Sequence, residues 1–201
     1  MKRIGLLAIV AMILTGPATA SNWVRVAERA VTEFGDHGSS VQHNGTIEYA
    51  FSPREGAEKL VLKVIGSARS EIHMMTYSLT SAPVVEALIA ARRRGVEVSI
   101  VADYKNNLVD DRSGKSRAAL SALLNAGCRV RTNSVYSIHH DKVIVADRET
   151  VETGSFNYSD AAARKNSENV MVVWKNPDLA RGYLTHWQDR FNKGEDYRTN
   201  Y

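Results

Sequence analysis

Residues 140–147 read HDKVIVAD and residues 154–157 read GSFN, and no other part of the chain gathers as many groups suited to phosphate chemistry. The apolar run in the first segment predicts a β-strand, whose side chains alternate between two faces. We therefore expect His140 and Lys142 on the same face. A turn at Gly154 would return two more polar side chains to meet them, those of Ser155 and Asn157.

These four side chains supply what cleavage of a phosphodiester requires. A histidine is a nucleophile that is neutral near pH 7, and a lysine ammonium binds phosphoryl oxygens. Serine and asparagine donate neutral hydrogen bonds where negative charge develops. The residues thus predict a phosphodiester-cleaving site that needs no metal ligand.

The spacing of the motif is H-x-K-x-x-x-x-D, six residues and then G-S-x-N. It resembles the signature of the phospholipase D superfamily, in its branch of small, single-motif, EDTA-resistant bacterial endonucleases. The resemblance extends from about Thr46 to Tyr201 and includes the ending HWQDR at residues 186–190. It implies an α/β fold, an α/β/α sandwich with a central mixed β-sheet, and no cofactor.

Glu168 falls where this superfamily keeps a carboxylate that orients the histidine. It would accept a hydrogen bond from the ring nitrogen of His140 that does not attack phosphorus, and so fix the tautomer. The resemblance implies five catalytic residues: His140, Lys142, Ser155, Asn157 and Glu168. Two further motif residues are expected to be structural: Asp147, which would tie the backbone of the motif, and Gly154.

Cleavage without a metal needs a nucleophile and an acid that protonates the leaving oxygen. Two histidines meet this need, because near a pKa of about 6.5 one imidazole can be neutral while another is protonated. The resemblance implies a two-step route through a covalent phosphohistidine. The chain has one His-x-Lys motif, so we expect the second His140 from another copy, in a symmetric homodimer.

Two alternatives within one chain stay open. His139 could be the second histidine, although in a regular strand it points to the face opposite His140. A metal could be held by His139, His140, Asp141 and Asp147, but adjacent strand residues diverge and the spacing matches no known ligand set. The remaining histidines lack a motif context: His37, His43, His73 and His186.

The N-terminus is expected to be a cleaved secretory signal. Two cations precede an apolar run from Ile4 to Leu14, and ATA at residues 18–20 suits cleavage before Ser21. The run is shorter than the roughly 20 residues that span a bilayer. We therefore expect an exported protein of the bacterial periplasm without stable membrane association.

Charge and cysteine content place weaker limits on function. Removal of residues 1–20 takes away two of the 26 Lys and Arg, which leaves 24 against 22 Asp and Glu and a net charge of +2. Bulk charge therefore gives little support to nucleic-acid binding, and basic clusters such as Arg92–Arg94 are a better indication. The single cysteine, Cys128, allows no internal disulfide and is expected to pack as a small hydrophobe.

The chain is expected to hold the signal peptide at residues 1–20, an N-terminal helix and linker at 21–45, and a phospholipase D-like nuclease domain at 46–201. Apolar runs in that domain predict strands at 47–51, 71–79, 96–103 and 170–174.

Capping residues, proline and glycine mark the helices of the domain. They predict helices that begin at Ser52-Pro53, Ser81 and Asn176-Pro177, and one around Leu120 that ends at Gly127. The last helix carries an apolar stripe of Leu179, Tyr183, Trp187 and Phe191. The polar stretch 104–114 is expected to be a loop that reaches over the site.

The predicted function is metal-independent hydrolysis of DNA by a homodimer, with little sequence specificity and with RNA as a further candidate substrate. A phospholipase D-type lipid phosphodiesterase would use the same residues, so the motif does not separate the two. A nucleic-acid-binding module without catalysis is the other alternative. Its usual mark is a missing motif His, Lys or Asn, and this sequence has all three.

Overall fold

The chain forms one mixed sheet of eight strands in the order β1-β7-β6-β5-β2-β3-β4-β8. The structure, a computed structural model, describes residues 45–199. β2, β3 and β4 are parallel, and the other neighbouring pairs are antiparallel. The strands are β1 (Ile47–Ser52), β2 (Glu71–Thr76), β3 (Glu97–Asp103), β4 (Arg129–Asn133), β5 (Lys142–Ala146), β6 (Thr150–Gly154), β7 (Glu168–Val173) and β8 (Glu195–Asp196).

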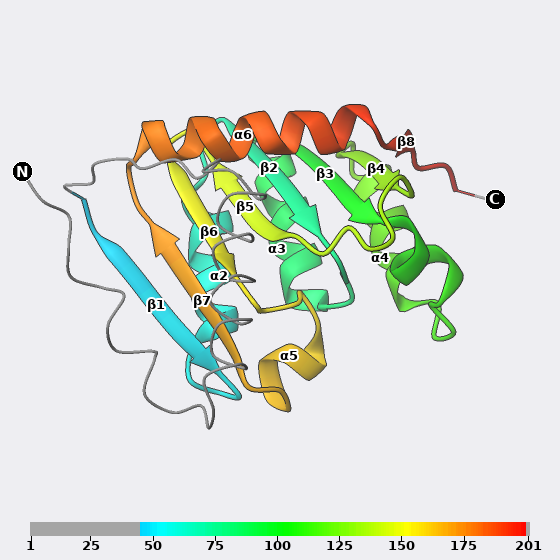
Figure 1. Ribbon diagram of the computed structural model, residues 1–201, viewed down its shortest axis with the longest axis horizontal. Helices are drawn as coiled ribbons and strands as arrows, with labels where there is room; N and C mark the ends of the chain where they lie inside the picture. The colour runs from blue at the N-terminus through cyan, green and yellow to red at the C-terminus, as the bar shows by residue number, and fades with distance from the viewer. Residues whose placement is uncertain (1–44, 200–201) are drawn as a thin grey trace, which may run out of the picture. The chain divides into compact units, whose positions relative to one another are not determined.

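Helices cover both faces of this sheet, which confirms the predicted α/β/α sandwich (Figure 1). The helices are α2 (Ala57–Ser67), α3 (Ala82–Arg93), α4 (Lys115–Asn125), α5 (Asp160–Arg164) and α6 (Pro177–Asn192), and one π-helical turn, η2 (Lys105–Val109), follows β3. The predicted signal peptide and N-terminal helix lie outside the described residues. Within residues 45–199, no helix is both long and apolar enough to cross a membrane.

Strand alternation divides the core into two clusters. On β2, Met74 packs with α2 and α3 in the larger cluster, whereas its neighbour Met75 packs with α6 in the smaller one. Trp187 and Phe191 of α6 are buried and stacked, so the predicted stripe of this helix is confirmed as core packing. Cys128 is buried in the larger cluster, and burial raises the pKa of its thiol to about 11.

Local capping places two helices where the sequence predicted them. Ser81 accepts a hydrogen bond from the Val84 backbone and begins α3, and Asn176 accepts one from Leu179 and begins α6. The helix predicted from Ser52-Pro53 begins later, at Ala57. Residues 53–56 instead form the connection from β1, which ends in a left-handed Gly56.

Two other predicted segments differ in extent. The strand predicted at residues 71–79 ends at Thr76, and the chain then turns to bring Leu79 beside Tyr158. The stretch predicted as a loop at 104–114 contains η2, in which the buried Asn107 side chain donates to the carbonyl oxygens of Tyr77 and Asp103. These hydrogen bonds fix η2 against the ends of β2 and β3, a long-range arrangement that local sequence does not encode.

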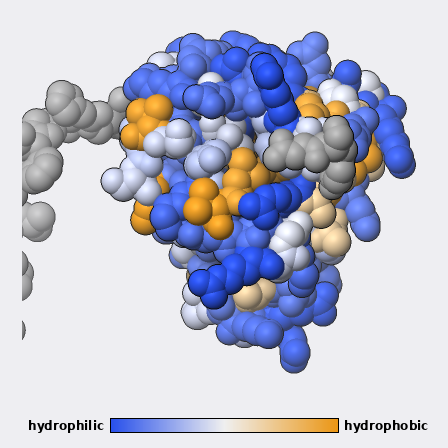
Figure 2. Space-filling model, turned by 90° about the vertical axis from the view of Figure 1, so that its right-hand side faces the viewer, coloured by the Kyte–Doolittle hydropathy of each residue, from blue (hydrophilic) through white to orange (hydrophobic). Residues whose placement is uncertain are grey.

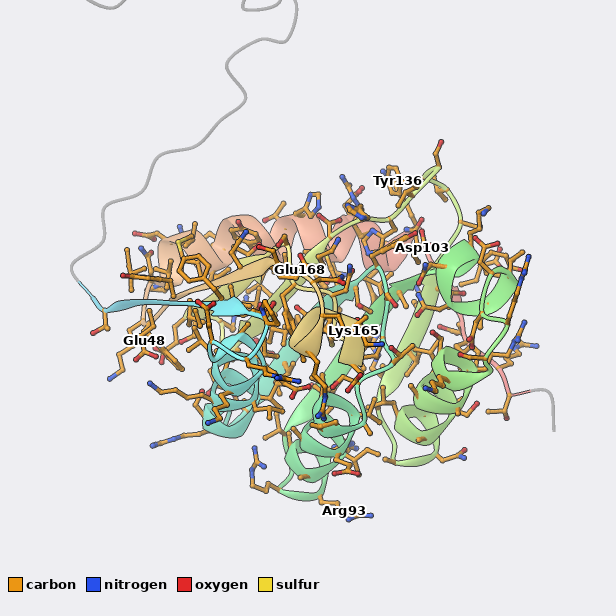
Figure 3. All side chains as sticks on the ribbon, turned by 90° about the horizontal axis from the view of Figure 1, so that it is seen from below. Glu48, Arg93, Asp103, Tyr136, Lys165 and Glu168 are labelled. Atoms are coloured by element: carbon orange, nitrogen blue, oxygen red, sulfur yellow. The ribbon has the colours of Figure 1, made fainter. Side chains whose placement is uncertain are left out.

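The strand register brings the motif to one edge of the sheet. Lys142 at the start of β5 pairs with Thr76 at the end of β2, and Gly154 at the end of β6 pairs with Val170 near the start of β7. We call this the catalytic edge. In Figure 3, which looks onto it, Glu168 lies near the middle and Asp103 farther toward η2.

Candidate active site

Lys142 is the most enclosed of the predicted catalytic side chains. Its residue is 6% exposed, and its ammonium donates a hydrogen bond of 2.7 Å to the carbonyl oxygen of His140. The same nitrogen lies 5.3 Å from the ring centre of Tyr77. Burial lowers the pKa of Lys142, and the nearby carboxylates Asp141 and Glu168 act in the opposite direction.

His140 lies just before β5 rather than within it, and its side chain is exposed at the catalytic edge. Its ring packs edge-on against Tyr77, with the two ring centres 4.6 Å apart. Tyr77 therefore contacts both His140 and Lys142. This packing limits the rotation of the imidazole and leaves it open to a substrate.

Glu168 and Ser155 form the second part of the site. The Ser155 hydroxyl donates to Glu168 at 2.6 Å, and the Asn166 amide donates to the other carboxylate oxygen at 3.0 Å. The hydrogen bond that we expected between Glu168 and His140 is thus replaced by one to Ser155. The reason is that β6 and β7 are neighbours, so Ser155 after β6 directly faces the start of β7.

Asn157 lies between two buried aromatic residues, Phe156 and Tyr158. Its amide oxygen is buried and has no hydrogen-bond partner among residues 45–199. A buried amide oxygen without a partner is costly in a folded protein. This oxygen requires a donor such as a water molecule, because the oxygens of a phosphodiester only accept hydrogen bonds.

Gly154 does not form the turn that we expected, because it is the last residue of β6 and pairs with Val170. Glycine is required there by close packing. A Cβ atom at this position would lie 2.1 Å from the carbonyl oxygen of Asn169. The absence of a side chain lets the Ser155 backbone approach β7, where its N–H donates to that same oxygen.

Asp147 lies at the opposite end of β5 from the catalytic edge. Its carboxylate accepts hydrogen bonds from the backbone N–H groups of Arg69, Ser70 and Glu71. Burial opposes ionisation, but these hydrogen bonds outweigh it and lower the pKa of Asp147. The carboxylate thus joins the end of β5 to the start of β2 and does not face the substrate.

The residues weighed as metal ligands do not come together, because Asp147 is separated from the others by the length of β5. In the part of the chain that the structure describes, no group of three or more His, Cys, Asp or Glu side chains is placed to share a metal ion. His139 is 1% exposed, and burial lowers its pKa. It therefore faces the interior while His140 faces solvent.

A polar network that the sequence did not reveal lies beneath the motif. Asp103, buried at the end of β3, accepts the backbone N–H of His139 at 2.7 Å and that of Asn106 at 2.6 Å. Asp141 lies between His139 and His186, 3.3 Å and 3.4 Å from their ring nitrogens. These contacts fix the segment that carries His140 to β3 and α6.

Tyr77 and Asp103 are the residues near the motif that sequence reasoning missed. Tyr77 gave no signal, because the strand predicted at residues 71–79 extended past it. A signal was present for Asp103, a polar residue at the end of the strand predicted at residues 96–103, because open α/β sheets bind ligands at the carboxyl ends of their strands. That signal was weaker than the motif, since it does not say which of several such residues face one another.

Three comparisons with known proteins identify the family. The model of the family described as cardiolipin synthase, phospholipase D-like domain, matches residues 61–192. The crystal structure of a phospholipase D family member, Nuc from Salmonella typhimurium, is 47% identical, with a TM-score of 0.73 over 77% of this chain and 99% of Nuc. A phospholipase D of Rickettsia bellii is 37% identical over 144 residues, 72% of this chain and 68% of that protein.

More distant similarity supports the fold alone. NucT from Helicobacter pylori has a TM-score of 0.65 at 20% identity, over 76% of this chain and all of NucT. The family match covers more than half of the chain, and the predicted superfamily and the likeness to its small single-motif members are thereby confirmed. The chain therefore belongs to the phospholipase D superfamily, as a hydrolase of the phosphodiesterase class with one His-x-Lys motif.

Proposed function

We propose that the protein is a metal-independent endonuclease that hydrolyses DNA with little sequence specificity, at a site shared by two copies of the chain. The observation that carries this proposal is the pairing of His140 with Lys142 at the catalytic edge. His140 is exposed, and the Lys142 ammonium is held beside it by a 2.7 Å hydrogen bond. A nucleophile and a cation for the phosphate thus lie together.

In the first step, the neutral imidazole of His140 attacks phosphorus, and the bond from phosphorus to the leaving oxygen breaks. Lys142 and Asn157 donate to the non-bridging oxygens as their charge rises. His140 of the partner subunit, in its imidazolium form, gives its proton to the leaving oxygen. The products of this step are a phosphohistidine and the freed strand end.

In the second step, water replaces the histidine. The now neutral His140 of the partner subunit takes a proton from water, and the resulting hydroxide attacks phosphorus. The phosphorus–nitrogen bond breaks, which returns His140 to its neutral form. Glu168 accepts the hydrogen bond of the Ser155 hydroxyl and so fixes the segment after β6 to the start of β7 at the catalytic edge.

A shared site follows from the number of accessible histidines. The mechanism needs two imidazoles near one phosphorus, and the chain exposes His140 at the motif while His139 is buried beneath it. A twofold axis near the catalytic edge would place two His140 side chains opposite one another. We therefore propose a homodimer as the active form, and, from the N-terminal sequence, export to the periplasm.

Cations at the catalytic edge favour a nucleic-acid substrate. Arg54 follows β1, and its backbone N–H bonds to Ala163 of α5, which also carries the exposed Lys165 at its end. Neither the Arg54 nor the Lys165 side chain forms an ion pair with a carboxylate among residues 45–199. Unpaired cations beside a scissile phosphate suit a polyanion, whose neighbouring phosphates they can bind.

A lipid phosphodiesterase is the second candidate, because several relatives are named phospholipase D and the matching family is described as cardiolipin synthase. The test is to incubate the purified protein in excess EDTA with supercoiled plasmid or with phosphatidylcholine vesicles. We expect nicking of the plasmid and no choline release. Choline release without nicking would replace the proposal by the lipid activity. Nicking that EDTA abolishes and a divalent ion restores would contradict the metal-free mechanism.

A further inference from the structure

A half-open hollow of about 430 Å³ lies beside η2, α4, β4 and β8, outside the catalytic residues. Its walls include two tyrosines, Tyr104 and Tyr197, and two arginines, Arg117 and Arg198. Figure 2 views the side of the molecule that carries β4 and β8, where hydrophilic groups predominate and apolar groups lie among them. The volume lies in the range of small-molecule sites in proteins.

The register of the sheet fixes the position of this hollow relative to the site. Lys142 pairs with Thr76, Thr76 with Ala102, and Ala102 with Thr132, which lines the hollow. Lys142 and Thr132 thus lie on one row across the sheet, three strand spacings apart. At about 4.8 Å for each spacing, the separation is roughly 14 Å.

Lys105 and Tyr77 lie between the two places. Hydrogen bonding to Asp110 raises the pKa of Lys105, and the Tyr77 hydroxyl and Asp103 are close enough to act in the same direction. Tyr77 in turn contacts His140. The chain residue before Lys105 is Tyr104, whose side chain is 42% exposed at the mouth of the hollow. The aromatic and cationic side chains of Tyr77, Lys105 and Tyr104 therefore lie between the motif and the hollow.

The walls of the hollow favour a neutral, flat, polar ligand. Tyr197 is held rigidly, because its hydroxyl is 2.9 Å from that of Ser121 and its backbone N–H bonds to Val130. Two carboxylates, Glu195 and Asp196, disfavour a phosphate, and the arginines disfavour a cation such as choline. A nucleobase has an aromatic face for stacking, and its edge carries donors and acceptors for both kinds of charge.

We infer that this hollow binds a base of the same nucleic-acid strand whose phosphodiester lies at His140. The inference rests on the proposed nuclease function and adds a subsite to it. One strand of a duplex rises about 3.4 Å per nucleotide, so roughly 14 Å corresponds to about four nucleotides, and to fewer in an extended strand. A lipid headgroup or a dinucleotide is too short to reach both places.

The test measures binding rather than cleavage. The His140→Asn protein is titrated with fluorescent oligothymidylates of two and twelve nucleotides. We expect Tyr104→Ala on this background to raise the Kd of the twelve-nucleotide probe roughly 5- to 150-fold, the loss expected for one base–aromatic stack. Tyr104→Phe keeps the ring and should bind as the parent does.

Two further variants complete the design. Tyr49→Ala removes another exposed tyrosine, on β1 and outside the hollow, and should leave the Kd unchanged. Arg198→Ala changes an exposed residue at the mouth and should weaken binding in the same direction as Tyr104→Ala. It keeps the inference testable if Tyr104→Ala fails to fold, which circular dichroism would reveal.

The subsite is refuted if Tyr104→Ala and Arg198→Ala bind the longer probe as the parent does, or if the parent binds both probes equally. Failure of the proposed function gives a different result. In that case the wild-type protein cleaves no DNA, whereas the dependence of binding on Tyr104 and on probe length persists. A nuclease without the subsite would cleave DNA and lack that dependence.

Discussion

Lys142 donates its 2.7 Å hydrogen bond to the carbonyl oxygen of His140, the other fixed residue of the same motif. The ammonium is thus held by a neutral backbone group, and it forms no ion pair with a carboxylate within residues 45–199. Its charge remains available to a phosphoryl oxygen that approaches His140. This relationship explains why the motif needs a lysine two residues after the histidine.

Replacement of this cation should abolish most of the turnover without unfolding the protein. We expect Lys142→Met to lower kcat by a factor of about 10² to 10³, as for the loss of one group that stabilises transition-state charge. Lys175→Met removes an exposed lysine at the other end of β7 and is the matched control. Equal rates for the two variants in a plasmid-nicking assay would show that Lys142 does not bind the phosphate.

Glu168→Gln should lower kcat roughly 10²-fold with little change in KM, because the amide keeps the shape of the side chain and loses the charge that fixes Ser155. The kcat of His140→Asn should be lower still, since this change removes the nucleophile and the acid together. Rates over a dilution series of plasmid separate kcat from KM. Wild-type kcat in Glu168→Gln would mean that the carboxylate has no positioning role.

Gly154→Ala should destabilise the fold by about 1–3 kcal/mol or more, because its Cβ would lie 2.1 Å from the Asn169 carbonyl oxygen. Gly66→Ala is the matched control. Gly66 lies in α2 with no atom within 4 Å of an added Cβ, so alanine should stabilise that helix by about 0.5–1 kcal/mol. Urea unfolding measures the change in unfolding free energy for each variant. A change of the same sign in Gly154→Ala and Gly66→Ala would contradict this explanation.

Glu152 should make the folding stability of the protein depend on pH. It is fully buried on β6, where burial raises its pKa from 4.5 to about 8 although the Tyr158 hydroxyl donates to it. The contribution of this group to stability is therefore fully present below pH 4.5, and it is lost as pH rises toward 8, because the unfolded chain releases the proton first. The loss is on the order of several kcal/mol across this window.

Glu152→Gln should remove this pH dependence, so that the variant loses less stability than the wild type between pH 5 and pH 8. Glu86→Gln changes an exposed glutamate of α3 and should leave the dependence in place. Urea midpoints at several pH values provide the comparison. If the urea midpoint changes with pH in the same way for wild type and Glu152→Gln, Glu152 ionises freely in the folded state.

The features that the sequence predicted correctly are those with a local cause. Asn176 and Pro177 begin α6 through a cap that spans four residues, and the apolar spacing of Trp187 and Phe191 specifies which side of the helix is buried. The motif spacing identified the family, because strand alternation and chemistry together restrict those positions.

The features that escaped prediction depend on contacts between distant segments. Glu168 bonds to Ser155 because β6 and β7 are neighbours, and strand order cannot be read from a single strand. Asp103 supports the His140 segment through the backbone of His139, 36 residues away in the chain. Composition and periodicity do not encode which polar group at a strand end meets which backbone segment.

The central claim is that each site uses one His140 from each of two copies, and subunit mixing tests it most directly. Wild-type and His140→Asn chains are unfolded together and refolded at fixed total concentration, and native mass spectrometry confirms random pairing. A dimer with one His140 lacks one of two required imidazoles, so activity should follow the square of the wild-type fraction. At equal mixing we predict about one quarter of full activity. A straight line, with about one half at equal mixing, would contradict the shared site and identify a site complete within one chain.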